Sequence, residues 1–205
     1  MAEDRKYRYG LKKTKYAIWD PTSETYSSLQ ELPGAVSLTL TAEGGDGSDF
    51  YADDGIWATF PGTNGGYSGD LELANIPDEA RVALLGEVVD PTSGVQFETT
   101  DAEPPEFALI TEAQTNIGPI ATVLYSVKAT RPEFNANTKG ENVDVDTETL
   151  SLRIGAREFT YNGEKKKFVK GTLQKTDENA DQYAAFFEDV VTPESGESGE
   201  SGLSA

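Results

Sequence analysis

The sequence predicts a mainly β protein of one domain, and three observations support this. The 205 residues are enough for a core that needs no metal or disulfide. Twenty glycines and ten prolines are spread between short apolar runs. Several of these runs alternate apolar and polar residues, which is the period of a strand with one buried face.

The first third of the chain is expected to contain strands and one long loop. Residues 14–20 are rich in β-formers and end at an Asp-Pro turn, so residues 25–29 are expected to return as their hairpin partner. Residues 36–42 show the clearest alternation, with an apolar face and a hydroxyl face. Residues 43–66 form a long loop, and residues 67–74 resume alternation.

Residues 77–89 are predicted to form a single central helix. Pro77 suits the first turn, and Asp78 and Glu79 favour the helix N-terminus. An Asp-Pro pair at residues 90–91 is expected to end the helix. The apolar residues at helical spacing are Val82, Leu85 and Val89.

Further strands are predicted at residues 95–98, 107–112, 120–130, 143–157 and 168–173. In the longest strand, one face is expected to carry Ala121, Val123, Tyr125 and Val127.

The strand at 143–157 needs a break or bulge near residues 147–149. Without it, carboxylates and aliphatic side chains would share one face. A short C-terminal helix follows, and residues 192–205 repeat Glu-Ser-Gly and are expected to form a flexible tail. The face of that helix is predicted to carry Ala180, Tyr183, Ala184 and Phe187.

The composition argues against an enzyme. The chain contains no cysteine and no histidine, which removes thiol nucleophiles, the commonest general base and the commonest zinc ligand. A carboxylate pair such as Asp144 and Asp146 could in principle cleave a glycosidic bond, but solvated strands commonly offer this spacing. We therefore expect no catalytic residues and no cofactor.

A metal site is not expected either. The acidic cluster of the loop fails the calcium-loop spacing, because apolar residues occupy positions that need oxygen ligands. Solvation of the loop explains the cluster better. Its members are Asp46, Asp49, Asp53 and Asp54.

Charge is distributed unevenly along the chain. Residues 1–15 hold six basic and two acidic side chains, a net of +4, whereas residues 16–163 hold six basic and twenty-five acidic ones, a net of −19. The acidic body argues against phosphate binding, and such a surface lets DNA pass without sticking. No signal peptide or membrane-spanning run is visible, so we expect synthesis in a cytoplasm and no membrane partner.

The order of short motifs over residues 10–193 resembles the major tail proteins of long-tailed, siphovirus-type bacteriophages. The motifs are GLK (10–12), LPGAVSL (32–38), YADDG (51–55), GGY (65–67), DLELANIP (70–77), ARVALLG (80–86), Pro104-Pro105, LYSVKATRP (124–132), TKGENVDVDTETLS (138–151) and FFEDVVTP (186–193). The resemblance leaves out a basic N-terminal arm (1–9) and the tail (192–205), and assigns residues 10–191 to one tail tube domain.

The resemblance implies a β-sandwich or barrel-like domain that assembles into hexameric rings stacked as a tail tube. DNA would pass through the channel without specific binding, and the assembly would work with tape-measure, terminator and initiator proteins. The implied location is the virion, after synthesis in the host cytoplasm. An acidic β-sandwich binding or adhesion module is the alternative, and it predicts a stable monomer.

Three groups of site residues follow from this reading, each with an ordinary alternative. The channel wall is predicted to include Asp70, Glu72, Asp144 and Asp146, which could equally lie on a solvated outer surface. The inter-ring loop, or else an ordinary surface loop, includes Asp49, Tyr51, Asp53, Asp54 and Trp57. The basic arm (Arg5, Lys6 and Arg8) is predicted to dock on the acidic body of a neighbouring subunit, rather than to bind nucleic acid or remain disordered.

Overall fold

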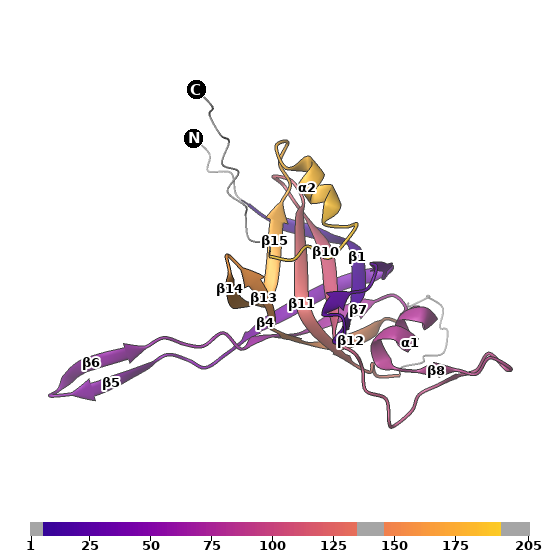
Figure 1. The fold of residues 1–205 in the computed structure, drawn as a ribbon, viewed down its shortest axis with the longest axis horizontal. Helices are drawn as coiled ribbons and strands as arrows, with labels where there is room; N and C mark the ends of the chain where they lie inside the picture. Colours follow the sequence, from indigo (N-terminus) through magenta and orange to yellow (C-terminus); the bar gives the residue numbers. More distant parts are fainter. Residues whose placement is uncertain (1–5, 135–145, 194–205) are drawn as a thin grey trace, which may run out of the picture.

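The computed structural model describes residues 6–134 and 146–193 of the chain (Figure 1). Within these residues, nine strands form one antiparallel sheet in the order β2-β1-β10-β11-β12-β7-β4, with β3 paired to β1 and β15 to β11. This confirms the prediction of a mainly β protein. The strands of the sheet are β1 (Arg8–Asp20), β2 (Thr25–Tyr26), β3 (Gln30–Glu31), β4 (Ala35–Glu43), β7 (Gly66–Leu73), β10 (Phe107–Thr115), β11 (Ile120–Thr130), β12 (Glu148–Gly155) and β15 (Lys170–Gln174).

Smaller elements surround this sheet. Two helices, as expected, lie in the described part of the chain, together with three two-stranded pairs. None of the helices in that part has the length and apolar character needed to cross a membrane. The elements are β5 (Ser48–Ala52) with β6 (Gly55–Phe60), β8 (Val88–Val89) with β9 (Gln96–Phe97), β13 (Arg157–Tyr161) with β14 (Glu164–Phe168), and the helices α1 (Asp78–Leu85) and α2 (Ala180–Ala185).

The sheet curls around an inner core, which gives the protein a sandwich-like or barrel-like body. One edge of β11 pairs with β10, and the other edge pairs with two strands in turn. Residues 120–124 of β11 pair with β15, and residues 126–130 pair with β12. β1 and β4, far apart in the sheet order, contact each other. Side chains from β7, β10, β11 and β12 fill the interior together with those of α1, and the largest fully buried ones include Leu71, Leu84, Phe107, Leu124 and Leu150.

A second core lies on the outer face of β1, β10 and β11. α2 and the segment after it cover this face, and Tyr183, Phe186 and Val190 are buried there. β10 therefore contributes to both cores: Phe107 and Leu109 point inward, whereas Ala108 and Ile110 point outward. This explains its continuous apolar sequence, because a strand that is buried on both faces has no polar side to alternate.

A β-bulge in β11 corrects one prediction. Between Leu124 and Val127 the strand gains a residue relative to its partner β10, which reverses the direction of the side chains that follow. Val123 and Tyr125 accordingly lie in the outer core, whereas Val127 lies in the inner core. The expectation that Val127 shares a face with Val123 and Tyr125 was wrong.

The two helices also differ in detail from the predictions. α1 ends at Leu85, because Gly86 adopts a left-handed conformation (φ 73°) and stops the helix four residues early. Val82 and Val89 are exposed, the latter in β8, and the buried residues are Ala80, Leu84 and Leu85. In α2, Ala180 and Ala184 of the predicted face are exposed.

The predicted break or bulge near residues 147–149 coincides with the start of β12 at Glu148, and residues 143–145 of the predicted strand lie outside the described residues. Leu150, Leu152 and Ile154 then all enter the inner core. Glu148 itself accepts a hydrogen bond from the Ile76 amide at 2.7 Å and pairs with Arg81 of α1. The start of β12 is thus tied to the start of the helix that closes one end of the core.

A buried carboxylate holds α2 against the sheet. Glu112 of β10 is only 4% exposed, and it accepts hydrogen bonds from the Tyr183 hydroxyl at 2.9 Å and the Lys13 ammonium at 2.8 Å. A bulge in β1, with Lys13 at φ 49°, accompanies this arrangement. Burial, and then the hydrogen bond to Glu112, raise the pKa of the Tyr183 hydroxyl, so it stays a donor at neutral pH.

Replacing the tyrosine should therefore destabilise the fold. We expect Tyr183→Phe to lower the free energy of unfolding by about 1.5–3 kcal/mol, since a buried charged acceptor loses one of its donors. Urea denaturation would measure this loss. Tyr51→Phe, at a tyrosine that is 64% exposed, is the matched control and should stay within about 0.5 kcal/mol of the wild type. Equal stability of the two variants would contradict this role of Tyr183.

Candidate assembly interface

One face of the strands β4, β7 and β12 is polar and solvent-facing, while the other packs on the inner core. Antiparallel pairing aligns the outward side chains in rows across the three strands. We call this surface the polar sheet face. Its three rows are Ser37–Glu72–Thr149, Thr39–Asp70–Ser151 and Thr41–Ser68–Arg153.

Hydroxyl groups bind the carboxylates of this face directly. Ser151 donates to Asp70 at 2.8 Å, and Ser37 and Thr147 donate to the two oxygens of Glu72 at 2.9 and 2.7 Å. Hydrogen bonds from Thr147 and then Ser37 lower the pKa of Glu72, because they stabilise its charged form. Glu72 therefore carries its charge at neutral pH, and both carboxylates of the face already accept hydrogen bonds from hydroxyl groups.

The structure brings together only part of the predicted channel wall. Asp70 and Glu72 are adjacent outward residues of β7, as the alternation indicated. Asp146 is exposed and precedes β12, so it does not belong to the rows. Asp144 lies outside the described residues. The assignment of these residues to a channel wall stays a prediction.

Residues 43–66 are not an irregular loop, which corrects the sequence-based expectation. They form a β-hairpin that continues β4 and β7 outward and projects along the longest axis of the molecule, clear of the body (Figure 1). We call residues 44–65 the arm. The amide of Gly65 bonds the carbonyl of Glu43 at 2.8 Å, and that of Thr63 bonds Gly45 at 3.0 Å, so pairing extends through its stem.

Local sequence explains the shape of the arm. Asp53 and Asp54 both have positive φ values, 50° and 61°, which is the two-residue turn that suits the twist of a hairpin. The stem is narrow and needs glycine: a Cβ on Gly62 would lie 2.6 Å from the Gly45 carbonyl oxygen, and one on Gly47 2.8 Å from that of Phe60.

The arm exposes apolar side chains on both of its faces. Phe50 lies opposite Ala58 and Phe60 opposite Ser48 on one face, whereas Tyr51 and Ile56 face each other on the opposite one. Trp57, at the bulge, is 69% exposed, and the other four large side chains are 54–64% exposed. Groups of uncovered aromatic residues are typical of interaction surfaces in general. A two-stranded hairpin alone is only marginally stable.

The arm is also acidic. Residues 44–65 contain four aspartates and no lysine or arginine. Of the predicted loop residues, Asp49, Asp53, Asp54, Tyr51 and Trp57 all lie in β5, β6 or the turn between them. Asp49 accepts a hydrogen bond from Thr59 across the hairpin at 2.7 Å. No group of three metal-ligating side chains occurs among the described residues, the arm included.

The basic N-terminal arm is described from Lys6 onward, and Arg5 lies outside the described residues. Lys6 is exposed and precedes the first strand, but Arg8 already belongs to β1, where it lies opposite Thr115. The alternation of basic residues with tyrosine in Lys6-Tyr7-Arg8-Tyr9 is the sequence signal that could have placed the start of this strand. Docking of the basic N-terminal segment on a neighbouring subunit stays a prediction.

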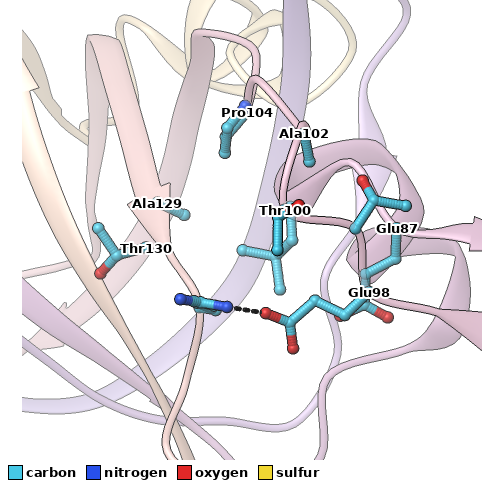
Figure 2. A pocket seen from close by; sticks show the side chains of 10 residues that line it. Glu87, Glu98, Thr100, Ala102, Pro104, Ala129 and Thr130 are labelled. Atoms are coloured by element: carbon cyan, nitrogen blue, oxygen red, sulfur yellow. Dashed lines mark hydrogen bonds and ion pairs between the residues drawn. The ribbon is translucent and has the colours of Figure 1, made fainter.

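A pocket of about 340 Å³ lies between the C-terminal end of α1 and the end of β11 (Figure 2). Thr100, Ala102 and Pro104 form one wall, and Ala129 and Thr130 form another. The exposed ion pair between Arg131 and Glu98 borders it, and such pairs contribute little stability. Three of its ten lining residues are charged, namely Glu87, Glu98 and Arg131.

No protein-family model matches this sequence, and a search of curated proteins finds no match either. The resemblance to phage tail proteins therefore depends on the motifs quoted above. The arm and the polar sheet face are features of the structure and do not depend on that resemblance.

The hydrogen bonds on the polar sheet face can be tested by titration. We expect Thr147→Ala to raise the pKa of Glu72 toward its ordinary value, because the strongest of its stabilising hydrogen bonds is lost. NMR titration of the Glu72 side-chain carboxyl would measure the shift. Ser151→Ala is the matched control, since Ser151 binds Asp70 instead and should leave Glu72 unchanged. An unchanged pKa of Glu72 in the Thr147→Ala variant would contradict the hydrogen bond from Thr147 as the cause of the lowered pKa.

Proposed function

We propose that this protein is the subunit of a tubular assembly, the tail tube of a long-tailed bacteriophage. Six copies would form a ring, and rings would stack into a conduit for DNA in the virion. One observation carries the proposal: a projecting hairpin with uncovered apolar side chains on both faces, set on a compact β body. Such an arm needs a partner surface on each side.

The geometry of the arm favours stacking over a closed dimer. The arm lies at one end of the longest axis, and α1 with β8 lies toward the other end (Figure 1). An arm that reaches a different surface on the next copy makes a head-to-tail contact, and such contacts continue into a filament unless a rotation closes them. A bacteriophage tail tube is an assembly of this kind.

The polar sheet face supports the role of the channel wall. Phosphates bind proteins mainly through lysine and arginine, whereas the rows of this face contain two carboxylates and one arginine among nine side chains. Both carboxylates already accept hydrogen bonds, from the hydroxyl groups of Ser37, Thr147 and Ser151, which occupies these three donors. DNA would be repelled weakly along such a wall and would slide past it.

An acidic β-sandwich binding or adhesion module is the second candidate, favoured by the same arm if its apolar faces meet a foreign protein. The two functions differ in what the purified protein does alone. The tube proposal requires contacts between copies, together with tape-measure, terminator and initiator proteins in the virion. The binding module requires a stable monomer.

Electron microscopy of the concentrated protein at low and high salt tests the proposal. We expect hollow tubes or six-fold rings, and we expect Trp57→Ser to raise the protein concentration needed for them by about tenfold or more, since a central buried aromatic is worth at least ~2 kcal/mol at an interface. Phe134→Ser is the matched control, because Phe134 is 91% exposed but lies outside the arm.

The opposite result is equally clear. A protein that stays monomeric at every salt and protein concentration, and also after the initiator complex of its phage is added, would exclude the tube subunit. The binding module would then be the better explanation of the arm.

A further inference from the structure

A groove of about 550 Å³ opens between the start of β1, the middle of β4 and β15. No residue of α1 lines it. Its apolar lining includes Leu11, Val36, Leu38 and Tyr67, and we call it the mouth groove. Val36 is 52% exposed, whereas Leu11, Leu38 and Tyr67 are half-buried against the inner core.

The mouth groove has an unusual charge for this protein. Arg8 and Lys170 line it, and none of its lining residues is acidic, although the chain has a net charge of −19. Lys170 lies over the ring of Tyr67 at 4.6 Å. Among the described residues neither Arg8 nor Lys170 has a carboxylate within ion-pair distance.

The arm has the complementary composition. It carries Asp53 and Asp54 at its turn, next to the exposed side chains of Tyr51 and Trp57, and it has no basic residue. The cations of the mouth groove would pair with the carboxylates of the arm. The apolar lining of the groove and the aromatic rings of the arm would both be removed from water by the contact. Arginine and lysine also bind favourably over aromatic rings.

We propose that the mouth groove receives the arm of a second copy of this chain. Tyr51 and Trp57 would enter the groove, and Asp53 and Asp54 would meet Arg8 and Lys170. The arm projects away from its own body, so the occupant belongs to another molecule (Figure 1). This inference rests on the proposed function and names the surface that the next copy offers.

The contact is heterologous, since the arm and the groove are different surfaces. Each copy therefore offers one donor and one acceptor, and the chain of contacts stays open. The inference also gives Arg8 a specific role: it meets the acidic arm of a neighbour, rather than a general acidic surface.

Photo-cross-linking in the full-length protein tests this directly. The probe is p-benzoylphenylalanine in place of Tyr51, which keeps an aromatic side chain at the tip of the arm. A mixture of isotope-labelled and unlabelled protein is irradiated, and cross-linked peptides are identified by mass spectrometry. We expect links between labelled and unlabelled copies, from Tyr51 to residues 8–11, 36–40 or 170–172. The same probe at Phe134 is the control and should not label these residues.

The outcomes separate this inference from the proposed function. Tubes in which Tyr51 labels another surface, another segment of the chain or nothing would overturn the groove assignment and leave the tube standing. Cross-links to the groove in a protein that forms no tubes would support binding of the arm in the groove and would count against the proposed tail tube function. No groove link in tubes or in concentrated solution overturns the inference.

A charge reversal gives an independent measure. We expect Lys170→Glu to weaken association between copies by about tenfold in light scattering, and reversal of Asp53 and Asp54 to lysine in the same chain to restore part of it. Lys167→Glu on β14 is the matched control, with the same change in charge outside the groove lining. Equal weakening by both single variants would contradict a specific contact.

Discussion

The strand pair β10–β11 is the constraint on which the rest of the structure depends. Both strands are buried on two sides, so each one must supply two cores at once. The inner core fixes the curl of the sheet and the position of α1, and the outer core fixes α2. The bulge at Tyr125 lets one strand serve both, because it reverses the alternation where β11 passes from β15 to β12.

β4 and β7, in contrast, are buried on one side only. They cover the inner core with one face only, and their other face carries rows of hydroxyl and carboxylate groups. Beyond Glu43 and Gly66 the same two strands leave the body and continue as the arm. The arm gains no core of its own there, so its aromatic side chains stay exposed. A polar wall and an apolar arm thus come from one continuous pair of strands.

Much of the fold could be predicted from the sequence, since alternation and turn residues act locally. The predicted bounds of β11 agree with the observed ones, and the shared parity of Asp144 and Leu150 predicted a break or bulge near the residue where β12 begins. The failures share a cause. Gly86 ends α1 through its backbone conformation, and the bulge in β11 depends on pairing with β10, neither of which alternation reveals. The prediction of a loop at residues 43–66 is wrong because the glycines there resemble turn residues, whereas in the structure they permit close pairing of the stem.

The sequence by itself determined the acidity of the chain, the absence of histidine and cysteine chemistry, and the polar and apolar sides of β7. These properties depend on residue type and local spacing. Only the tertiary structure decided which groups meet. Ser37 and Thr147 reach Glu72 from separate strands, and Arg8 and Lys170 line one groove although 162 positions separate them in the numbering. Such contacts follow from strand order in the sheet, and local spacing contains no information about that order.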